Sequence, residues 1–243
     1  MSVNQSFFKD EPKTLVEAAY RQIYVDIMEG RLLPGQRLRV EHLKGHYRVG
    51  AATLREALVL LVADALVIGV GQRGFRVKPM SLHDIKDITE TRVMLETEAL
   101  RQSILEGDGQ WEEGLITAYY RLSHVHDKLA AGSCDINEWE ERNRAFHEAL
   151  IAASPSNWVR HFLVILFRQS ERYRRLSVLT KPIERDGKVE HEAIFKAALA
   201  RDVEQAVKLL SHHIRITYEG LNSLPPEFFE ESAVKRPVPR SVS

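Results

Sequence analysis

Two polar side chains in the stretch NRAFHEAL, Asn143 and His147, lie four residues apart in a segment with helical spacing. Residues at this separation share one face of a helix. Two histidines far along the chain, His191 and His213, are possible companions. Imidazole nitrogen is a preferred ligand of zinc and similar divalent ions, and helical bundles build such sites from several helices. Spacing alone does not separate this interpretation from ordinary packing, which is the more common role of any one histidine.

These residues belong to a part of the chain in which every segment has a helical pattern. Ser81, followed three residues later by Asp84, is typical of a helix N-terminus, and this first helix is expected to end at Gly107. Five further helical segments follow: QWEEGLITAYYRLSHVHDKLAA, INEWEERNRAFHEALIAAS, SNWVRHFLVILFRQSERYRRLSV, VEHEAIFKAALAR and DVEQAVKLLSHHIRITYEGL. We expect an all-α bundle over residues 80–222 with room for a ligand inside. The proline-rich residues 223–243 are expected to form a loosely ordered tail.

The first 80 residues have a different pattern. Helical periodicity predicts a helix in TLVEAAYRQIYVDIMEG, a short helix in VEHLKGHY after the turn LLPGQRL, and a third helix in AATLREALVLLVADAL. Two short strands, LVIGV and GFRVKP, are joined by glycines that allow a tight turn. Three helices, the last two in tandem, followed by a hairpin describe a winged helix-turn-helix. The predicted fold class is mostly α, with a flexible N-terminus at 1–13, this winged unit at 14–79 and the all-α bundle.

A winged helix-turn-helix suits DNA, because the major groove, about 12 Å wide, accepts one helix. Arg55 lies near the start of the second tandem helix, where a guanidinium can reach a guanine edge. Arg73, next to Gly74 at the hairpin tip, can approach phosphates or a narrow minor groove. The alternative is that Arg55 forms a surface ion pair with Glu41 or Glu56 and that the unit binds protein. The order of elements favours DNA.

Charge and hydropathy narrow the class of protein. The formal net charge is zero, but the first 80 residues hold 12 Lys and Arg against 8 Asp and Glu, a modest sign of a polyanionic partner. The apolar run ALVLLVADALVIGV is interrupted by Asp64 and is too short to span a bilayer, and the N-terminus has no signal-peptide pattern. A cytoplasmic protein with no membrane partner is expected. The single cysteine excludes an internal disulfide.

Several motifs resemble one family. PGQRL, LREAL, GQRGFRV and PMSLHDIKDITETRVMLE resemble the GntR family of bacterial transcription regulators, and Glu90, Arg92, Leu95 and Glu96 match the ExRxxLE form of its FadR branch, which has an FCD ligand-binding domain. The resemblance covers residues 14–222. Within the branch, the chain is similar to repressors of short dicarboxylate catabolism in the glutarate and γ-aminobutyrate pathways. The resemblance implies a sequence-specific DNA-binding regulator, a repressor by the family's default, and no enzyme.

The resemblance also implies which residues contact DNA. Thr53 and Arg55 match DNA-contacting positions of the family. Lys44 and Arg48 are basic positions close to the groove, which either contact phosphates or form a solvated helix face. Ala51 stands where the family usually has an arginine that contacts DNA. Because one good bidentate contact is worth roughly 1–3 kcal/mol of discrimination, an altered operator or weaker base readout is implied.

The resemblance further implies a metal site. The FCD motif has a carboxamide or carboxylate one turn before the histidine of FH, a histidine in EH and a third histidine in the last helix; Asn143, His147, His191 and His213 match it in order. The implied ion is divalent, zinc first, with nickel and others open. The family more often has Asp at the first position, and an Asn oxygen is a neutral, weaker ligand. Four histidines match no motif and are expected to be solvated or packed: His124, His126, His161 and His212.

A metal with open coordination positions can bind a small carboxylate, while an arginine neutralises the other end of that ligand. Arg92 is expected to be this arginine, with Arg172 and Tyr173 as second choices; the competing interpretation of Arg92 is an ion pair with Glu96 one turn on. The implied switch is a homodimer that presents two winged units to a pseudo-palindromic double-stranded operator. The carboxylate effector releases the DNA by favouring another arrangement of the units.

Two rival functions are considered. A metal-dependent hydrolase or lyase would need Glu148, Glu190 or Glu192 as general base, but residues next to a ligand on a helix point away from its face. The chain also has no nucleophile elbow, Gly-rich phosphate loop or HExxH pattern. The other rival is a DNA-binding protein without an effector, whose histidines are structural.

Overall fold

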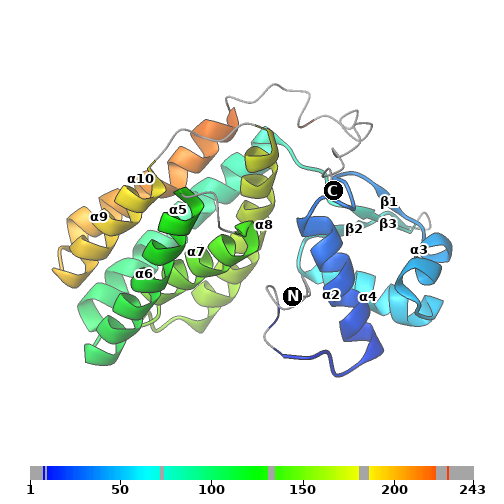
Figure 1. Ribbon diagram of the computed structural model, residues 1–243, viewed down its shortest axis with the longest axis horizontal. Helices are drawn as coiled ribbons and strands as arrows, with labels where there is room; N and C mark the ends of the chain where they lie inside the picture. Colours follow the sequence, from blue (N-terminus) through cyan, green and yellow to red (C-terminus); the bar gives the residue numbers. More distant parts are fainter. Residues whose placement is uncertain are drawn as a thin grey trace. The chain divides into compact units, whose positions relative to one another are not determined.

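The computed structural model describes residues 8, 10–71, 74–130, 135–180, 186–222 and 229, and divides into two compact units, one formed mainly by residues 10–84 and the other by residues 85–222. The elements of the first unit, labelled in Figure 1, are α2 (Leu15–Met28), β1 (Arg37–Leu38), α3 (Val40–Tyr47), α4 (Ala51–Ala63), β2 (Val67–Gly69) and β3 (Phe75–Val77). The predicted tandem helices and hairpin are therefore present.

The core of the winged unit lies between α2 and α4. Ile23 of α2 and three leucines of α4, Leu54, Leu58 and Leu61, have no exposed surface, as their helical spacing predicts. Thr14 caps α2 by accepting a hydrogen bond from the backbone N–H of Glu17. Each cap and each buried stripe is a local pattern, and for this reason the helices begin and end close to where the sequence predicts them.

The sheet has one strand more than predicted. Its order is β1-β3-β2 with antiparallel pairing throughout, and β1 aligns Leu38 with Phe75 of β3. Leu38 is buried, so β1 closes one side of the small core. A strand of two residues has no alternation to detect in a sequence, and its pairing with β3 depends on contacts made across the unit.

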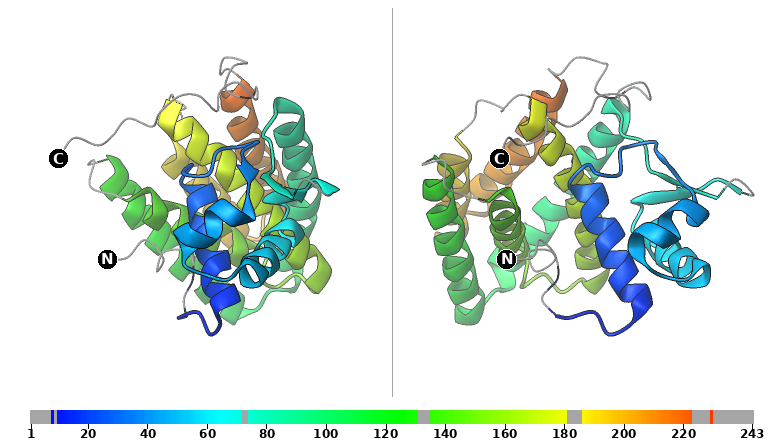
Figure 2. Two further views of the ribbon diagram at one scale, coloured as in Figure 1. Left: turned by 90° about the vertical axis from the view of Figure 1, so that its right-hand side faces the viewer. Right: turned by 45° about the vertical axis from the view of Figure 1, so that its right-hand side comes forward.

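The second unit is a bundle of helices, with no strand among its described residues (Figures 1 and 2). Its elements are α5 (Leu82–Glu106), α6 (Gly109–Ala130), α7 (Ile136–Leu150), α8 (Asn157–Thr180), α9 (Gly187–Leu199) and α10 (Val203–Asn222). The predicted Ser81 cap of α5 is confirmed, because its hydroxyl accepts from the backbone N–H of Asp84 at 3.0 Å. The mostly α fold class, a winged helix-turn-helix with an all-α bundle, is confirmed.

The bundle has an apolar core and a polar layer within it. Leu100, Leu115, Phe146, Leu163 and Leu210 come from five helices and pack into one cluster. Beside this cluster, charged and polar side chains of α5, α7, α8, α9 and α10 are also buried. Buried polar groups are costly unless they are paired, so this layer marks the part of the bundle where chemistry is expected.

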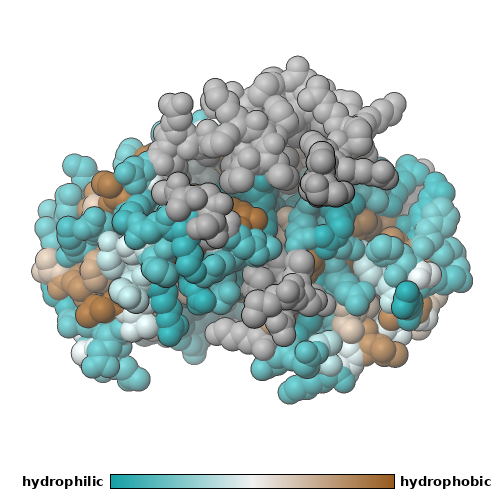
Figure 3. Space-filling model, viewed as in Figure 1, coloured by the Kyte–Doolittle hydropathy of each residue, from teal (hydrophilic) through white to brown (hydrophobic). Residues whose placement is uncertain are grey.

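The surface and the chain ends complete the description. The face in Figure 3 is mostly hydrophilic, and none of the described helices combines the length and apolar content needed to cross a membrane. Arg73, most of the predicted flexible N-terminus and nearly all of the predicted tail at residues 223–243 lie outside the described residues. The two units meet in sequence after Asp84, within the first turn of α5.

Candidate metal centre and nucleic-acid interface

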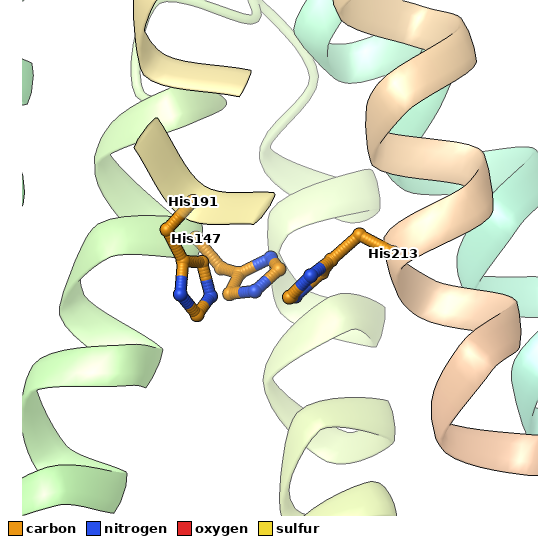
Figure 4. Close-up of side chains that lie close together, drawn as sticks. All are labelled: His147, His191 and His213. Atoms are coloured by element: carbon orange, nitrogen blue, oxygen red, sulfur yellow. The ribbon is translucent and has the colours of Figure 1, made fainter. Parts of the chain in front are cut away.

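Three histidines from three helices meet inside the bundle. His147 of α7, His191 of α9 and His213 of α10 are all buried. One ring nitrogen from each lies within 4.8 Å of the others, and Figure 4 shows the three rings turned toward a common point. Three converging imidazoles are a typical ligand set for a divalent transition metal.

Asn143 lies one turn before His147 on α7 and is also buried. Its Oδ1 has no hydrogen-bond partner among the residues that the structure describes. Leaving a buried oxygen without a partner costs about 1–3 kcal/mol, so the position calls for a positively charged or donor group. A divalent cation beside the three imidazoles would satisfy this oxygen. The residues present therefore fit a metal site of three imidazoles and one neutral oxygen.

Each of the three rings has a second contact on its outer side. Nδ1 of His147 lies 3.2 Å from Oε2 of Glu96, and Nδ1 of His213 lies 2.7 Å from Oε2 of Glu190. Nδ1 of His191 lies 3.1 Å from Nε2 of His126. Partners of this kind fix the orientation and tautomer of ligand histidines. Because Nδ1 is engaged in each ring, Nε2 is the nitrogen that metal coordination would use.

Burial and charge set the ionisation of this cluster. Burial lowers the pKa of His147, and the hydrogen bond to Glu96 only partly opposes that effect, so the ring favours its neutral, metal-binding form. Burial also works against a charge on Glu96, but Arg92 and His147 together outweigh it and lower the pKa of this carboxyl group. Glu96 is therefore an ionised acceptor that orients His147.

Arg92 is held at the edge of the cluster by two contacts. Its Nε lies 2.6 Å from Oε1 of Glu96, and its Cζ lies 4.9 Å from the centre of the Phe167 ring. The ion pair that the sequence offers as a competing interpretation of Arg92 is therefore present. Glu96 joins Arg92 to His147, which places the guanidinium one side chain away from the histidine cluster. Burial lowers the pKa of Arg92, as expected of a cation that is removed from water.

In the winged unit, two of the predicted DNA-contacting residues, Thr53 and Arg55, lie in the first turns of α4. Arg55 is exposed on α4 and forms no ion pair within 4.0 Å among the described residues; Glu41 pairs with Lys44 instead, although the charge of Arg55 also helps to lower the pKa of Glu41. Thr53 is half-buried, and Ala51 is the first residue of the helix. The exposed arginine is thus presented to a partner by the helix that a winged helix-turn-helix inserts into DNA.

The other predicted DNA-contacting residues that the structure describes differ in their local structure. Lys44 is exposed and forms an ion pair with Glu41 at 2.5 Å. Arg48, also exposed, ends α3 in the left-handed region with φ of 55°. Gly74 has φ of +86°, a conformation that favours glycine at the hairpin tip. Arg48 and Lys44 are therefore both accessible to a partner, and Glu41 partly neutralises the charge of Lys44.

Comparison with known proteins identifies the family. The bacterial regulatory proteins of the gntR family match residues 15–77, and the FCD domain matches residues 87–216. The chain belongs to the GntR family. Over 203 residues it is 48% identical to the HTH-type transcriptional regulator BphR of Paraburkholderia xenovorans strain LB400, covering 83% of each protein. It is 34% identical over 199 residues to the HTH-type transcriptional repressor GlaR of Escherichia coli strain K12, covering 80% of this chain and 90% of GlaR.

Solved structures share the fold of this GntR regulator. A transcriptional regulator GntR from Rhodococcus sp. RHA1 superimposes with a TM-score of 0.68 at 20% identity, covering 86% of this chain and 99% of that one. McbR/YncC of E. coli superimposes with a TM-score of 0.67 at 18% identity, covering 86% of this chain and 97% of that one. This chain is therefore a transcription regulator that combines a winged helix-turn-helix with an FCD domain.

The structure changes the ranking of the arginines on α8. Arg172 is buried and donates from Nη1 to Oε1 of Gln169 at 3.2 Å, and Tyr173 is fully buried. Arg174 is not among the site residues predicted from the sequence. Its positive charge contributes to lowering the pKa of both His147 and Arg92. It also donates two hydrogen bonds to the carboxylate of Glu140. Phe167 contacts the His147 ring, and Arg174 lies seven residues beyond it on the same face of α8. The contact between Phe167 and His147 is tertiary, so the sequence alone gives no signal that could have found Arg174.

Two neighbours of the histidines make contacts that the sequence analysis does not specify. Glu190 was expected to point away from the ligand face, yet its carboxylate contacts His213, because α10 packs against α9 and brings that ring to it. His126, expected to be solvated or packed, is half-buried between Trp139 and His191. The remaining three unmatched histidines are exposed: His124, His161 and His212.

An open groove of about 510 Å³ lies elsewhere on the bundle, between α6 and α7. Arg121 and Arg142 line it together with small residues such as Gly114 and Ala145. None of the clustered histidines takes part in it. The predicted effector cavity inside the bundle therefore stays a prediction.

Proposed function

We propose that this GntR regulator is a repressor whose winged unit binds a double-stranded operator and whose FCD domain binds a divalent metal and a small carboxylate that releases the DNA. The observation that carries the proposal is the buried cluster of His147, His191 and His213, with the buried Asn143 oxygen, which lacks a hydrogen-bond partner among the described residues, one turn before His147 on α7. The name of the relative GlaR supports repression as the direction of control.

The proposed ligands of the metal are Asn143, His147, His191 and His213. Zinc is the first choice because it favours imidazole nitrogen, and nickel shares that preference. A bound ion supplies a positively charged, Lewis-acidic centre that attracts an anion. All four proposed ligands are neutral when Asn143 replaces the more usual Asp, so the full ionic charge is available to an anionic effector. Glu96 and Glu190 hold two of the rings in place.

Arg92 is the proposed second anchor of the carboxylate effector. It is buried, cationic and joined to the histidine cluster through Glu96. Arg172 and Tyr173 stay proposed contacts from α8, and the charge effects on His147 add Arg174 to them. A guanidinium matches a carboxylate geometrically, which suits it to bind the end of an effector away from the metal.

In the DNA complex, Arg55 and Thr53 are proposed to face base edges from α4. Lys44, Arg48, Arg73 and Gly74 are proposed to lie along the phosphate backbone. A homodimer would place two such units on the half-sites of a pseudo-palindromic operator, since a two-fold protein matches a two-fold site. The regulator would act in the cytoplasm, where its operator is.

The rival function, a metal-dependent hydrolase or lyase, is not favoured. Each of its candidate bases has a partner: Glu148 lies near Arg144, Glu190 contacts His213 and Glu192 pairs with Lys196. A general base must reach a metal-bound water; Glu148 and Glu192 are paired with cations of their own helices, and Glu190 contacts Nδ1 of His213, the side of the ring away from the proposed metal-binding nitrogen.

A fluorescence-anisotropy titration tests the proposal. The purified protein, loaded with zinc, is titrated against its own upstream intergenic DNA and a scrambled duplex at one fixed salt concentration. We expect clear preference for the native DNA, and release of that DNA by one or more small carboxylates in the zinc-loaded protein. Release that is unchanged after removal of the metal would contradict the metal-dependent switch, and equal binding of both duplexes would contradict specific DNA recognition.

A further inference from the structure

The outward face of α4 carries an unusual mixture of side chains for a DNA-reading helix. Consecutive helical residues are about 100° apart, so Ala52, Arg55, Glu56 and Val59 lie on one stripe. All four are exposed, and Val59 has 57% of its surface accessible. A valine in this position presents two methyl groups directly in line with Arg55, one turn further along the helix.

The opposite face of α4 fixes this orientation. Leu54, Ala57, Leu58 and Leu61 are fully buried against the rest of the winged unit. Turning Val59 inward would require the helix to rotate and expose these four side chains, at a loss of several buried apolar groups. The outward position of Val59 is therefore determined by the core, and Figure 3 shows hydrophobic surface on the winged unit beside α4.

One further apolar side chain shares this stripe, since Val62, three residues beyond Val59, is exposed to 38%. Leu60 is exposed to 47%, but lies about 100° round the helix from Val59. Single exposed apolar residues are common and need no explanation. Val59 differs because it is the more exposed of the two valines and lies one turn from Arg55, on the face that a winged helix-turn-helix turns toward the major groove, whereas Val62 lies two turns from Arg55.

We propose that Val59 is a specificity-determining residue that contacts the C5-methyl group of a thymine in each operator half-site. The major groove is where thymine displays this methyl group, and apolar side chains read it by contact. Arg55 and Val59 are four residues apart, about 6 Å along the helix, which corresponds to roughly two base pairs. The thymine is therefore expected about two base pairs from the guanine that Arg55 reads. This inference rests on the proposed DNA binding.

The test uses a duplex that the full-length protein selects from a random-sequence library. Each thymine of the selected half-site is replaced in turn by deoxyuridine, which lacks only the methyl group, and affinity is measured by anisotropy at fixed salt. We expect one position at which the replacement weakens binding about fourfold per half-site, the equivalent of one buried methyl group. The variant Val59→Ala should bind the thymine duplex about fourfold more weakly per half-site and no longer distinguish thymine from deoxyuridine there.

Leu60→Ala is the matched control, since it truncates a similarly exposed apolar side chain away from the stripe. It should discriminate thymine from deoxyuridine as the wild type does. The inference is overturned if no deoxyuridine replacement weakens the wild type, or if Val59→Ala keeps the full difference. A wild type that selects no sequence at all would overturn the proposed DNA recognition, and this inference with it.

Discussion

The metal candidate depends on which atoms surround each histidine. His147 and His213 have carboxylate partners, Glu96 and Glu190, whereas His191 has a neutral imidazole partner, His126. A carboxylate strengthens a ligand imidazole more than a neutral ring does, so His191 is the least supported of the three ligands. The hydrogen bond to His126 and the edge-on contact with the Phe146 ring help to orient it.

Replacing His126 by Phe should weaken zinc binding about 10- to 100-fold, the usual effect of losing such an outer partner. Phenylalanine keeps a ring against Trp139 but cannot hydrogen-bond to His191. His126→Gln, whose amide oxygen can still accept a hydrogen bond from Nδ1 of His191, should bind zinc close to wild type. The measurement is competition with a chromogenic chelator. Equal affinities for the wild type and His126→Phe would show that His126 does not position the ligand.

Helix α3 is short, and Tyr47 is its only buried residue. The contacts of Tyr47 therefore hold α3 against the rest of the winged unit. The Tyr47 hydroxyl donates to Oδ2 of Asp26 on α2 at 2.6 Å, and Arg31 binds the other oxygen at 2.5 Å. Burial, and then the hydrogen bond to Asp26, raise the pKa of Tyr47, so its hydroxyl stays protonated. This bond connects α3 to α2 and therefore positions the tandem pair.

Tyr47→Phe should lower the free energy of unfolding by about 1–2 kcal/mol at neutral pH, because Asp26 loses a buried donor. Tyr47 in the unfolded chain ionises near its ordinary pKa of about 10, whereas the folded form does not. Its stabilising effect is thus complete below that pH and falls as pH rises above it, so the difference between the two proteins should narrow. Urea denaturation measures this, with the exposed Tyr120→Phe as a control near zero. A constant difference at all pH values would contradict the assignment.

At the scale of the whole molecule, the regulator separates its two tasks. The candidate DNA-contacting residues lie in the unit of residues 10–84, and the histidine cluster lies in the unit of residues 85–222. Each unit has its own buried core. Damage at one candidate site should therefore leave binding at the other site intact, although control of one by the other requires both.

Arg55→Ala should weaken operator binding by about 1–3 kcal/mol, roughly 5- to 150-fold, while zinc content stays at the wild-type value. His147→Ala should lose zinc and effector-driven release, and should still bind the operator. Arg101→Ala, which removes an exposed arginine of the other unit, controls for the loss of one charge. Anisotropy and metal analysis of the same samples decide the outcome. Normal operator binding by Arg55→Ala would refute the placement of α4 in the groove.

The sequence by itself determined the helices, the winged helix-turn-helix and the set of candidate ligands. Helical periodicity, the Ser81 cap and the glycines of the hairpin are local patterns, and they act within a few residues of where they are read. Asn143 and His147 share a face for the same local reason. Assigning His191 and His213 to the same cluster needed the family resemblance, since spacing alone left it undecided.

Only the tertiary structure decided which side chains surround these ligands. Glu96 meets His147 across 51 residues and His126 meets His191 across 65, and neither contact leaves a periodic trace in the sequence. The addition of Arg174 to the candidates on α8, the contact of Glu190 with His213 and the pairing of β1 depend in the same way on how elements pack. Local patterns fix which face of a helix is buried, but only packing fixes what that face meets.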